Sequence, residues 1–265
     1  MKQALINGAR SFLPRSIRRK IFSFGYHVDR ESFEEFSFLY GFTPNMELGL
    51  KAVAERGLAP KTVLDVGAFK GEWSQLAREI WPDAAITMFE PNADRISGLS
   101  DVASSISADL RDVLLGADFG KEVTFYVMDS GSSVLPENSP LEREEVTKSL
   151  STLDHECGSQ TSEHRDTFIK ADAQGFELEI LRGGKSVLER SVAVLLEVAL
   201  IEINAGAPLL DEVVEFMKGH GFVSYEILGI HRRPLDKAMN QVDILFVHQS
   251  SDLLENKSHF KKEVG

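Results

Sequence analysis

Residues 62–80 read TVLDVGAFKGEWSQLAREI, and this stretch decides the fold. It opens with a short β-branched run and closes with the apolar spacing of an amphipathic helix. The turn between the two contains Gly67 and Gly71, and glycine allows the backbone dihedrals and close approaches that such a turn needs. A strand that passes through a glycine turn into a helix is typical of proteins built on a parallel sheet.

The same alternation of strand and helix patterns continues to residue 249. We expect strands at 62–66, 85–90, 106–110, 167–173, 192–198, 222–229 and 241–249. We expect helices at 72–80, 93–99, 176–183, 185–190 and 209–220. This order predicts an α/β domain whose sheet is covered by helices on both faces.

Three segments lie outside this alternation. Residues 1–58 form an N-terminal extension, with a basic amphipathic helix followed by two helices that a turn at 41–44 joins. Residues 111–166 are an irregular insert within the domain 59–250, with an extra strand at 122–128 and a turn-rich loop over one edge of the sheet. Residues 251–265 are polar, and we expect a loose tail.

The composition bounds the classes of partner. The chain has 265 residues, of which 43% are hydrophobic and 26% charged, as in one globular domain with a small appendage. Its formal net charge of −12 would repel a phosphate backbone, so we expect no nucleic-acid partner. The phenylalanine-rich stretch 33–42 is either a roof over the core or the contact face of a homo-oligomer.

Location is predicted from what the sequence lacks. Cys157 is the only cysteine, so no internal disulfide forms. No apolar run reaches the roughly 18 residues that span a bilayer, and basic residues interrupt any signal-peptide core in 1–28. We therefore expect a cytoplasmic protein. The basic N-terminal helix either packs on its own domain or makes peripheral contact with the inner membrane surface or a partner.

Glycines and carboxylates gather where the first predicted strands end. In an open α/β sheet, ligands bind at the carboxyl ends of the strands, beside the first strand. Asp65 lies at the end of that strand, before Gly67 and Gly71. Glu90 lies at the tip of the second strand, where a carboxylate can accept both hydroxyls of a ribose. These positions predict a nucleoside-containing cofactor.

Two cofactor classes compete for this loop: nicotinamide or flavin dinucleotides, and S-adenosylmethionine. A dinucleotide loop needs a second glycine where this chain has Phe69. Asp65 would repel a pyrophosphate, whereas it suits the ammonium and sulfonium charges of S-adenosylmethionine. Asp172 and Glu197 end two further strands, so the strand ends would present a row of carboxylates. This row favours a cationic ligand.

The ordered motifs VLDVGAFKGEW, FEPN, GSSV, LD at 153–154, IKADAQGFELEILRGG, LLEV and QVDILFV, spread over residues 60–249, together resemble the FkbM-type methyltransferases. The resemblance implies a Rossmann-like class I methyltransferase fold with a seven-stranded, mostly parallel sheet, and S-adenosylmethionine as the cofactor. The better-known members are O-methyltransferases that act on hydroxyls of sugars, polysaccharides or natural products. The resemblance therefore implies that the partner of this chain is a small-molecule or glycan acceptor of the methyl group.

The resemblance also implies roles for individual residues. It puts the loop after the first strand against the cofactor, Glu90 on the ribose, and Asp172 and Glu177 beside the methyl-transfer centre. This chain departs from the family at Phe69, where an asparagine is usual, and at Gln174, where an acid is common. The candidate cofactor-binding residues are Asp65, Gly67, Ala68, Phe69, Gly71, Glu90, Pro91, Asp109 and Asp172.

Methyl transfer to a hydroxyl needs alignment of the acceptor with the methyl group, and a general base or a metal within hydrogen-bond reach. Asp172 is the first candidate for the base, and Glu177 and Glu197 are alternatives. No N-P-P-Y or D-P-P-Y signature follows the fourth strand, which favours an oxygen acceptor. Ser132, Ser133 and Gln174 are candidate acceptor contacts. The seven histidines form no HxH or HxxxH pair, so we expect no metal.

Two other functions stay open at this point. A catalytically silent relative would bind a nucleoside or a partner protein without turnover, and would tolerate loss of Asp172 and Glu177. A nicotinamide dehydrogenase would need phosphate binding, which Asp65 and Phe69 both oppose. Because the residues of the methyltransferase motifs are intact, the sequence favours the enzyme.

Overall fold

The computed structural model describes residues 30–39, 41, 43–128, 131–158 and 165–259. The chain divides into two compact units, Met1–Leu48 and Gly49–Gly265. The predicted basic helix within residues 1–28 lies outside the described residues. Among the helices that are described, none is long and apolar enough to cross a membrane.

The first unit contains helix α3 (Arg30–Leu39) and the start of helix α4 (Met46–Glu55). Asn45 caps α4, because its Oδ1 accepts a hydrogen bond of 2.9 Å from the backbone N–H of Leu48. These helices match the pair predicted on either side of the turn at 41–44. The remainder of α4 belongs to the second unit, where Leu50 and Val53 are buried.

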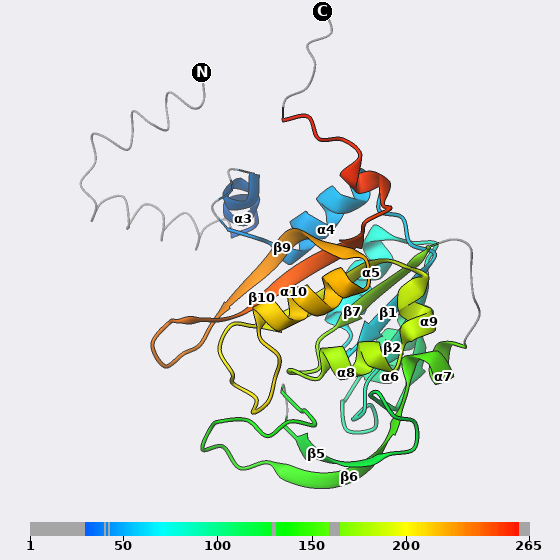
Figure 1. The fold of residues 1–265 in the computed structure, drawn as a ribbon, viewed down its shortest axis with the longest axis vertical. Coiled ribbons are helices and arrows are strands. Elements are labelled where there is room, and N and C mark those ends of the chain that lie inside the picture. The colour runs from blue at the N-terminus through cyan, green and yellow to red at the C-terminus, as the bar shows by residue number, and fades with distance from the viewer. Residues whose placement is uncertain (1–29, 40, 42, 129–130, 159–164, 260–265) are drawn as a thin grey trace, which may run out of the picture. The chain divides into compact units, whose positions relative to one another are not determined.

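A seven-stranded sheet in the order β3-β2-β1-β7-β8-β10-β9 forms the centre of the second unit (Figure 1). Strand β10 runs antiparallel to both of its neighbours, and the other neighbouring pairs are parallel. The predicted mostly parallel sheet is therefore confirmed. Its strands are β1 (Thr62–Val66), β2 (Ala85–Phe89), β3 (Asp109–Arg111), β7 (Thr167–Ala171), β8 (Ser191–Ala199), β9 (Phe222–Arg232) and β10 (Met239–His248).

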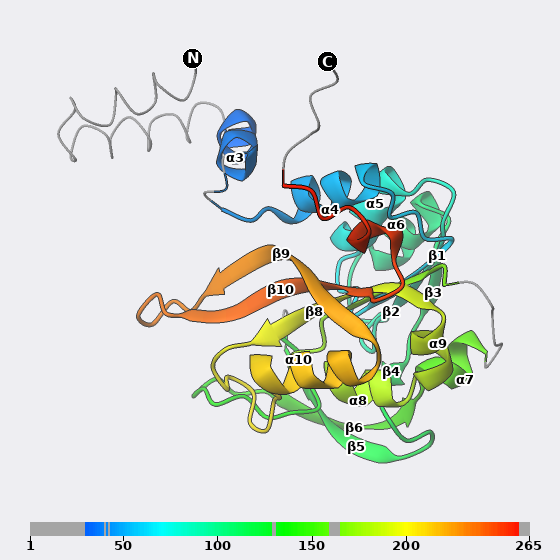
Figure 2. The same cartoon turned by 45° about the horizontal axis from the view of Figure 1, so that its top comes forward.

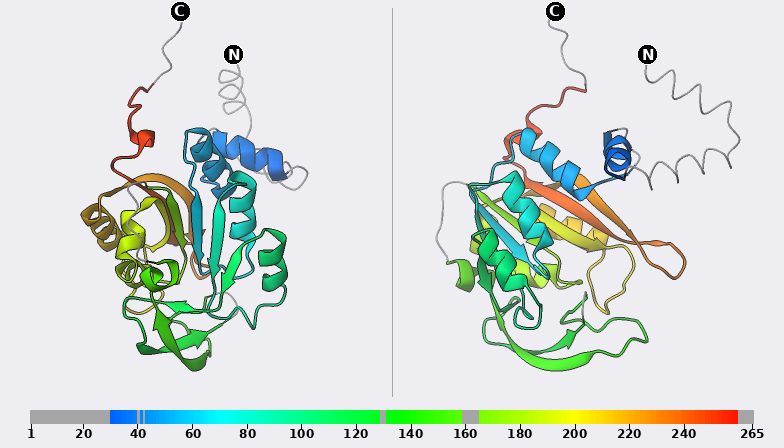
Figure 3. Two further views of the ribbon diagram at one scale, coloured as in Figure 1. Left: turned by 90° about the vertical axis from the view of Figure 1, so that its right-hand side faces the viewer. Right: turned by 180° about the vertical axis from the view of Figure 1, so that it is seen from behind.

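Helices cover both faces of this sheet (Figure 3). One face carries α5 (Glu72–Ile80) and α6 (Leu99–Ser105), and the other carries α8 (Glu177–Arg182), α9 (Lys185–Glu189) and α10 (Leu210–Gly219). Every residue of β7 is buried, as expected for a central strand that is covered on both sides. The largest apolar cluster lies between the sheet and α8–α10; it includes Ile169, Leu181, Leu196 and Met217.

The predicted bounds of two elements after β2 are wrong. The predicted helix at 93–99 is a series of turns, and α6 begins only at Leu99, after Gly98 with a φ of 83°. Leu99 and Ala103, one helical turn apart, supply the buried face of this helix. Because α6 continues to Ser105, the third strand begins at Asp109 rather than at 106.

The predicted irregular insert contains a second, three-stranded sheet in the order β4-β6-β5. Strand β5 (Glu122–Val127) is the expected extra strand, and it pairs antiparallel with β6 (Glu144–Ser151). Strand β6 pairs in parallel with the short β4 (Leu114–Leu115). Figure 2 shows this small sheet below α8 and α10. Helix α7 (Leu153–Cys157) also lies within the predicted insert, and a 3-10 helix η1 (Asp252–Leu254) lies in the predicted tail.

Candidate active site

A cavity of about 1000 Å³ lies where β1, β2 and β7 end, and its wall also includes residues of the small sheet. The loops that follow the three parallel strands therefore face the insert across one space. Many of the residues predicted for cofactor and acceptor meet there. Those that line the cavity are Gly67, Phe69, Glu90, Pro91, Ser132, Ser133, Asp172 and Gln174.

Glycine is required at the two predicted positions of the loop after β1. Gly67 has a φ of 74°, and a Cβ at this position would lie 2.0 Å from the carbonyl oxygen of Asp172. The loops after β1 and β7 thus approach more closely than a side chain permits. Gly71 has a φ of 79°, and a Cβ there would lie 2.7 Å from Val102 Cγ1. Gly71 therefore serves the packing of α5 against α6, outside the cavity wall.

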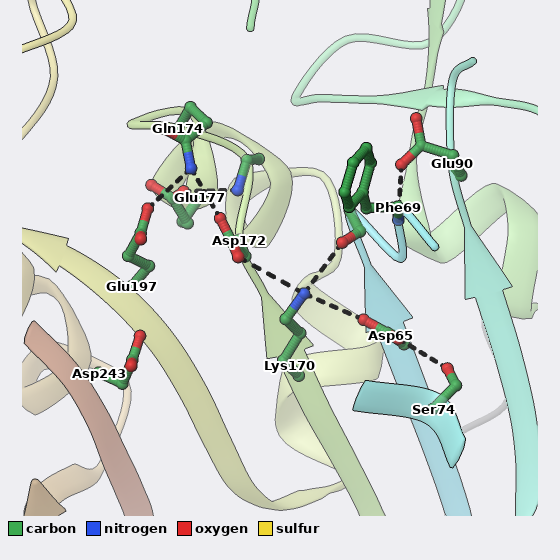
Figure 4. Close-up of polar contacts among 12 residues, drawn as sticks. Asp65, Phe69, Ser74, Glu90, Lys170, Asp172, Gln174, Glu177, Glu197 and Asp243 are labelled. Carbon is green, nitrogen blue, oxygen red and sulfur yellow. Dashed lines mark hydrogen bonds and ion pairs between the residues drawn. The ribbon is translucent and has the colours of Figure 1, made fainter. Parts of the chain in front are cut away.

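Glu90 follows β2 and lies in the cavity wall with both carboxylate oxygens held by backbone donors. The N–H of Phe69 donates to Oε2 at 2.9 Å (Figure 4), and the N–H of Asn92 donates to Oε1 at 3.0 Å. Burial raises the pKa of Glu90, and these two bonds oppose the rise. Each carboxylate oxygen has a second lone pair, so Glu90 can also accept hydroxyl groups from a ligand.

Asp65 is fully buried and does not line the cavity. Ser74 Oγ donates to its Oδ2 at 2.6 Å, and Lys170 Nζ lies 3.2 Å from its Oδ1 (Figure 4). Lys170 also donates to the carbonyl oxygen of Gly67 at 3.0 Å and lies 3.8 Å from Asp172 Oδ2. Burial lowers the pKa of Lys170, but the carboxylates of Asp65 and Asp172 outweigh it and raise that pKa well above its usual value.

The ion pair between Lys170 and Asp65 corrects the prediction that Asp65 belongs to a row of carboxylates that favours a cationic ligand. Because Lys170 neutralises Asp65 within the interior, Asp65 adds no free negative charge for a cationic ligand. Of the carboxylates in the predicted row, only Glu90 and Asp172 line the cavity and can contribute negative charge to it. The sequence did contain a signal for Lys170, since a lysine within the apolar run TFIKADA can be buried only with a partner.

Gln174 joins two of the predicted catalytic carboxylates. Its Nε2 donates to Asp172 Oδ1 at 3.0 Å and to Glu197 Oε2 at 2.9 Å (Figure 4). Asp172 lines the cavity with its side chain 38% exposed, whereas Glu197 lies behind Gln174. Burial and the nearby charges of Asp172, Glu177 and Asp243 raise the pKa of Glu197 well above its usual value. Of these carboxylates, Asp172 is the one in reach of an acceptor in the cavity.

Glu177 shapes the loop after β7. Its Oε1 accepts hydrogen bonds from the backbone N–H groups of Ala173 at 2.7 Å and Gly175 at 3.1 Å. Burial raises the pKa of Glu177 to about 7. Its side chain is buried and does not line the cavity, so the geometry makes Glu177 a positioning residue for the loop that carries Asp172 and Gln174.

The predicted serine pair lies in the cavity wall, and both hydroxyls already have protein partners. Ser132 Oγ donates to the carbonyl oxygen of Met128 at 2.7 Å, and Ser133 Oγ donates to that of Gln174 at 3.1 Å. Beside them Asn92, which the sequence did not single out, is buried in the wall. Its Oδ1 has no hydrogen-bond donor among the described residues, so it offers an acceptor to a ligand.

The remaining candidate residues lie away from the cavity. Ala68 is buried in the loop after β1. Asp109 is exposed on the edge strand β3, where its carboxylate pairs with Arg111 at 2.8 Å. The predicted residues that do not line the cavity are Asp65, Ala68, Gly71, Asp109, Glu177 and Glu197.

The sheet order, the reversed strand β10 and the cavity beyond β1 and β2 define the class I methyltransferase fold. A family model described as the methyltransferase FkbM domain matches residues 65–224. Since this match covers more than half of the chain, the protein belongs to the FkbM methyltransferase family.

Several solved methyltransferases are similar in structure at low identity. An FkbM methyltransferase from Methylobacillus flagellatus KT is 16% identical with a TM-score of 0.42; the match covers 70% of this chain and 43% of that chain. Precorrin-6y C5,15-methyltransferase from Geobacter metallireducens GS-15 is 17% identical with a TM-score of 0.41, over 76% and 86% of the two chains. Magnesium protoporphyrin IX methyltransferase from Synechocystis PCC 6803, solved with bound S-adenosylmethionine, is 10% identical with a TM-score of 0.43, over 76% and 79%. No curated protein matches the chain.

Proposed function

We propose that this protein is an S-adenosylmethionine-dependent O-methyltransferase that methylates a hydroxyl of a sugar, a glycan or a small-molecule natural product. The observation that carries the proposal is that Glu90, Asn92 and Asp172 surround one cavity at the ends of β1, β2 and β7. The first two residues can bind a nucleoside, and the third can accept a proton from an alcohol.

The cavity wall fits the nucleoside part of the cofactor. Glu90 keeps free lone pairs beside its two backbone bonds, and Asn92 Oδ1 is a buried acceptor without a donor. Ribose hydroxyls supply the donors that these oxygens lack. Because Gly67 has no Cβ, the loop after β1 can lie close to the loop after β7. The negative charge of Glu90 disfavours a phosphate group in this part of the cavity.

The residues around Asp172 fit a general base. S-adenosylmethionine supplies an electrophilic methyl group on a sulfonium. Asp172 accepts the proton of the attacking hydroxyl, while Lys170 and the amide of Gln174 hold its carboxylate in one orientation. Glu197 fixes Gln174 from the other side. The protein thereby orients the base toward the cavity, and alignment of the acceptor is its main contribution to the rate.

The acceptor is proposed to be an alcohol for two reasons. An alcohol needs a base near the methyl group, and Asp172 lies in the cavity wall. The chain also lacks the N-P-P-Y signature after β7. The small sheet forms the other side of the cavity through residues such as Phe125 and Val127, so the insert is the part that selects the acceptor.

Calorimetry with Glu90→Ala tests the cofactor. The wild type should bind S-adenosylmethionine and S-adenosylhomocysteine but not NAD, and the variant should lose about tenfold or more in affinity, since each hydrogen bond to a charged group contributes about 1.5–3 kcal/mol. Asp109→Ala is the matched control, because Asp109 is an exposed carboxylate outside the cavity. Failure of the wild type to bind S-adenosylmethionine would overturn the proposal.

Turnover tests the chemistry. With labelled cofactor and a panel of hydroxylated sugars and natural products, the wild type should form O-methylated products. Asp172→Asn should bind the cofactor and lose turnover by a factor of about 10² to 10⁴, the usual contribution of a general base. Cofactor binding without turnover on any acceptor would favour the silent binding module, and methylation of amines alone would contradict the O-directed assignment.

A further inference from the structure

A second cluster of ligand-type side chains lies on the strands beyond Glu197. Asp243 on β10 is directly opposite Glu197 on β8, and its other neighbour in the register is Gly229 on β9. His231 lies two residues further along β9. One ligand atom each from Glu197, His231 and Asp243 can be chosen so that all three lie within 4.8 Å of one another. None of the three lines the cofactor cavity.

The backbone makes room for this arrangement. A Cβ on Gly229 would lie 1.9 Å from Asp243 Oδ2, so the carboxylate of Asp243 occupies the space that the glycine leaves. The register of β9 and β10 also shifts between Asp243 and Ile244. The same Oδ2 lies 2.8 Å from His231 Nε2. Glycine at 229 thus lets the carboxylate turn toward the histidine, as a shared ligand site requires.

The other carboxylate of the cluster, Glu197, is held in place by side chains from outside the cluster. Gln174 Nε2 and Gln241 Nε2 both donate to Glu197 Oε2, at 2.9 and 2.7 Å. Amide donors of this kind fix the orientation of a carboxylate, as the outer partners of metal ligands do. Glu197 Oε1 accepts no hydrogen bond within the part of the chain that the structure describes, so this oxygen can serve a ligand.

The spacing suits a divalent cation. Metal–ligand distances of about 2.0–2.2 Å place neighbouring ligand atoms about 3 Å apart and opposite ones about 4.2 Å apart. His231 Nε2 and Asp243 Oδ2 are 2.8 Å apart, and the ligand atoms of all three residues lie within 4.8 Å of one another. The cluster therefore covers the range of these separations. A divalent cation would also relieve the repulsion between the two facing carboxylates, Glu197 and Asp243, and this ligand set suits manganese, iron or zinc.

We propose that Glu197, His231 and Asp243 bind one divalent first-row transition-metal cation. His231 is 47% exposed, so a cation can enter from solvent and keep water in its open positions. The site touches the proposed active site through Gln174, which also bonds to Asp172. Its occupancy is measured without a methyl donor, so the outcome does not depend on the proposed function.

Metal binding to the full-length protein tests the proposal. After chelator treatment, Mn²⁺ and Zn²⁺ are titrated separately by calorimetry, with thermal melting in parallel. The wild type should bind one equivalent and melt at a higher temperature with metal. His231→Ala and Asp243→Asn should each lose about tenfold or more in affinity. His220→Ala, a histidine on the far end of α10, and Asp236→Asn, an exposed carboxylate in the β9–β10 turn, should bind as the wild type does.

Two outcomes would overturn the proposal. One is that neither cation binds the wild type at millimolar concentration. The other is that His231→Ala keeps wild-type affinity, which would leave the cluster as an ion pair between His231 and Asp243. Circular dichroism spectra accompany each variant, and because His231 is half exposed, His231→Ala decides the question if Asp243→Asn fails to fold.

Discussion

Replacing Lys170 by methionine is expected to destabilise the protein by about 3 to 5 kcal/mol, the usual cost of removing one partner from a buried ion pair. Methionine keeps an apolar stem of similar length and removes the ammonium group. That group lies 3.2 Å from Asp65 Oδ1 and donates to the carbonyl oxygen of Gly67 at 3.0 Å. Asp65 is fully buried, so in the variant its charge keeps only the hydrogen bond from Ser74.

This cost is large enough to read from a melting curve. One kcal/mol shifts the melting temperature of a domain of 150–250 residues by about 2–4 °C, so the variant should melt about 6–20 °C below the wild type. Lys121→Met is the matched control, because Lys121 pairs with Asp118 at 3.1 Å while both side chains are more than half exposed. An exposed pair of this kind contributes at most about 1 kcal/mol.

A double-mutant cycle isolates the pair itself. Urea unfolding of Lys170→Met, Asp65→Asn and the double variant should give a coupling free energy of about 0.5–3 kcal/mol, because each single change strands the other charge. The reasoning is refuted if Lys170→Met costs less than about 1 kcal/mol, the value for an exposed pair. It is equally refuted if the two single costs add without coupling.

Two further substitutions test the loops around the cavity. Burial raises the pKa of Glu177 from 4.5 to about 7, so the folded state holds this proton more tightly than the unfolded chain and the wild type loses stability as pH rises from about 4.5 to about 7. Glu177→Gln keeps the hydrogen-bond acceptor and does not titrate. Between pH 4.5 and 8, the free energy of unfolding measured in urea should fall by about 3 kcal/mol more for the wild type than for this variant. Equal pH profiles would contradict a raised pKa of Glu177. Gly67→Ala places a Cβ 2.0 Å from the carbonyl oxygen of Asp172 at a φ of 74°, so we expect a lower melting temperature and weaker S-adenosylmethionine binding in calorimetry. Gly120→Ala is the control for the positive φ, because a Cβ there meets nothing within 4 Å. Unchanged binding by Gly67→Ala would contradict the close approach of the two loops.

The elements with strong local signals were predictable from sequence. Helix α5 has the predicted bounds, because a glycine turn precedes it and its apolar residues keep one face. The central strands were also predictable, since burial on both faces produces continuous apolar runs such as VAVLLEV. Strand β6 was missed because its sequence, EEVTKSLS, is largely polar, and only its pairing with β5 and β4 makes it a strand.

The residues that line the site were predictable only in part. Strand ends are local features, so Gly67, Glu90 and Asp172 could be placed at one edge of the sheet before the structure was known. Their partners depend on register, which the sequence does not state. Lys170 faces Asp65 because β1 and β7 pair with these two residues opposite each other. A slip of one residue would turn the lysine to the other face of the sheet.

Register also explains why a glutamine stands at 174, where the resemblance implies that an acid is common. Asp172 and Glu197 approach each other from neighbouring strands, and the amide of Gln174 donates to both. An acid at this position could donate to only one of them, and only while protonated. Glu197 already lies opposite Asp243, so a third negative charge between Asp172 and Glu197 would need a cation close by. The glutamine amide bonds to both carboxylates without adding a charge, so Lys170 is left to pair with Asp65 and Asp172.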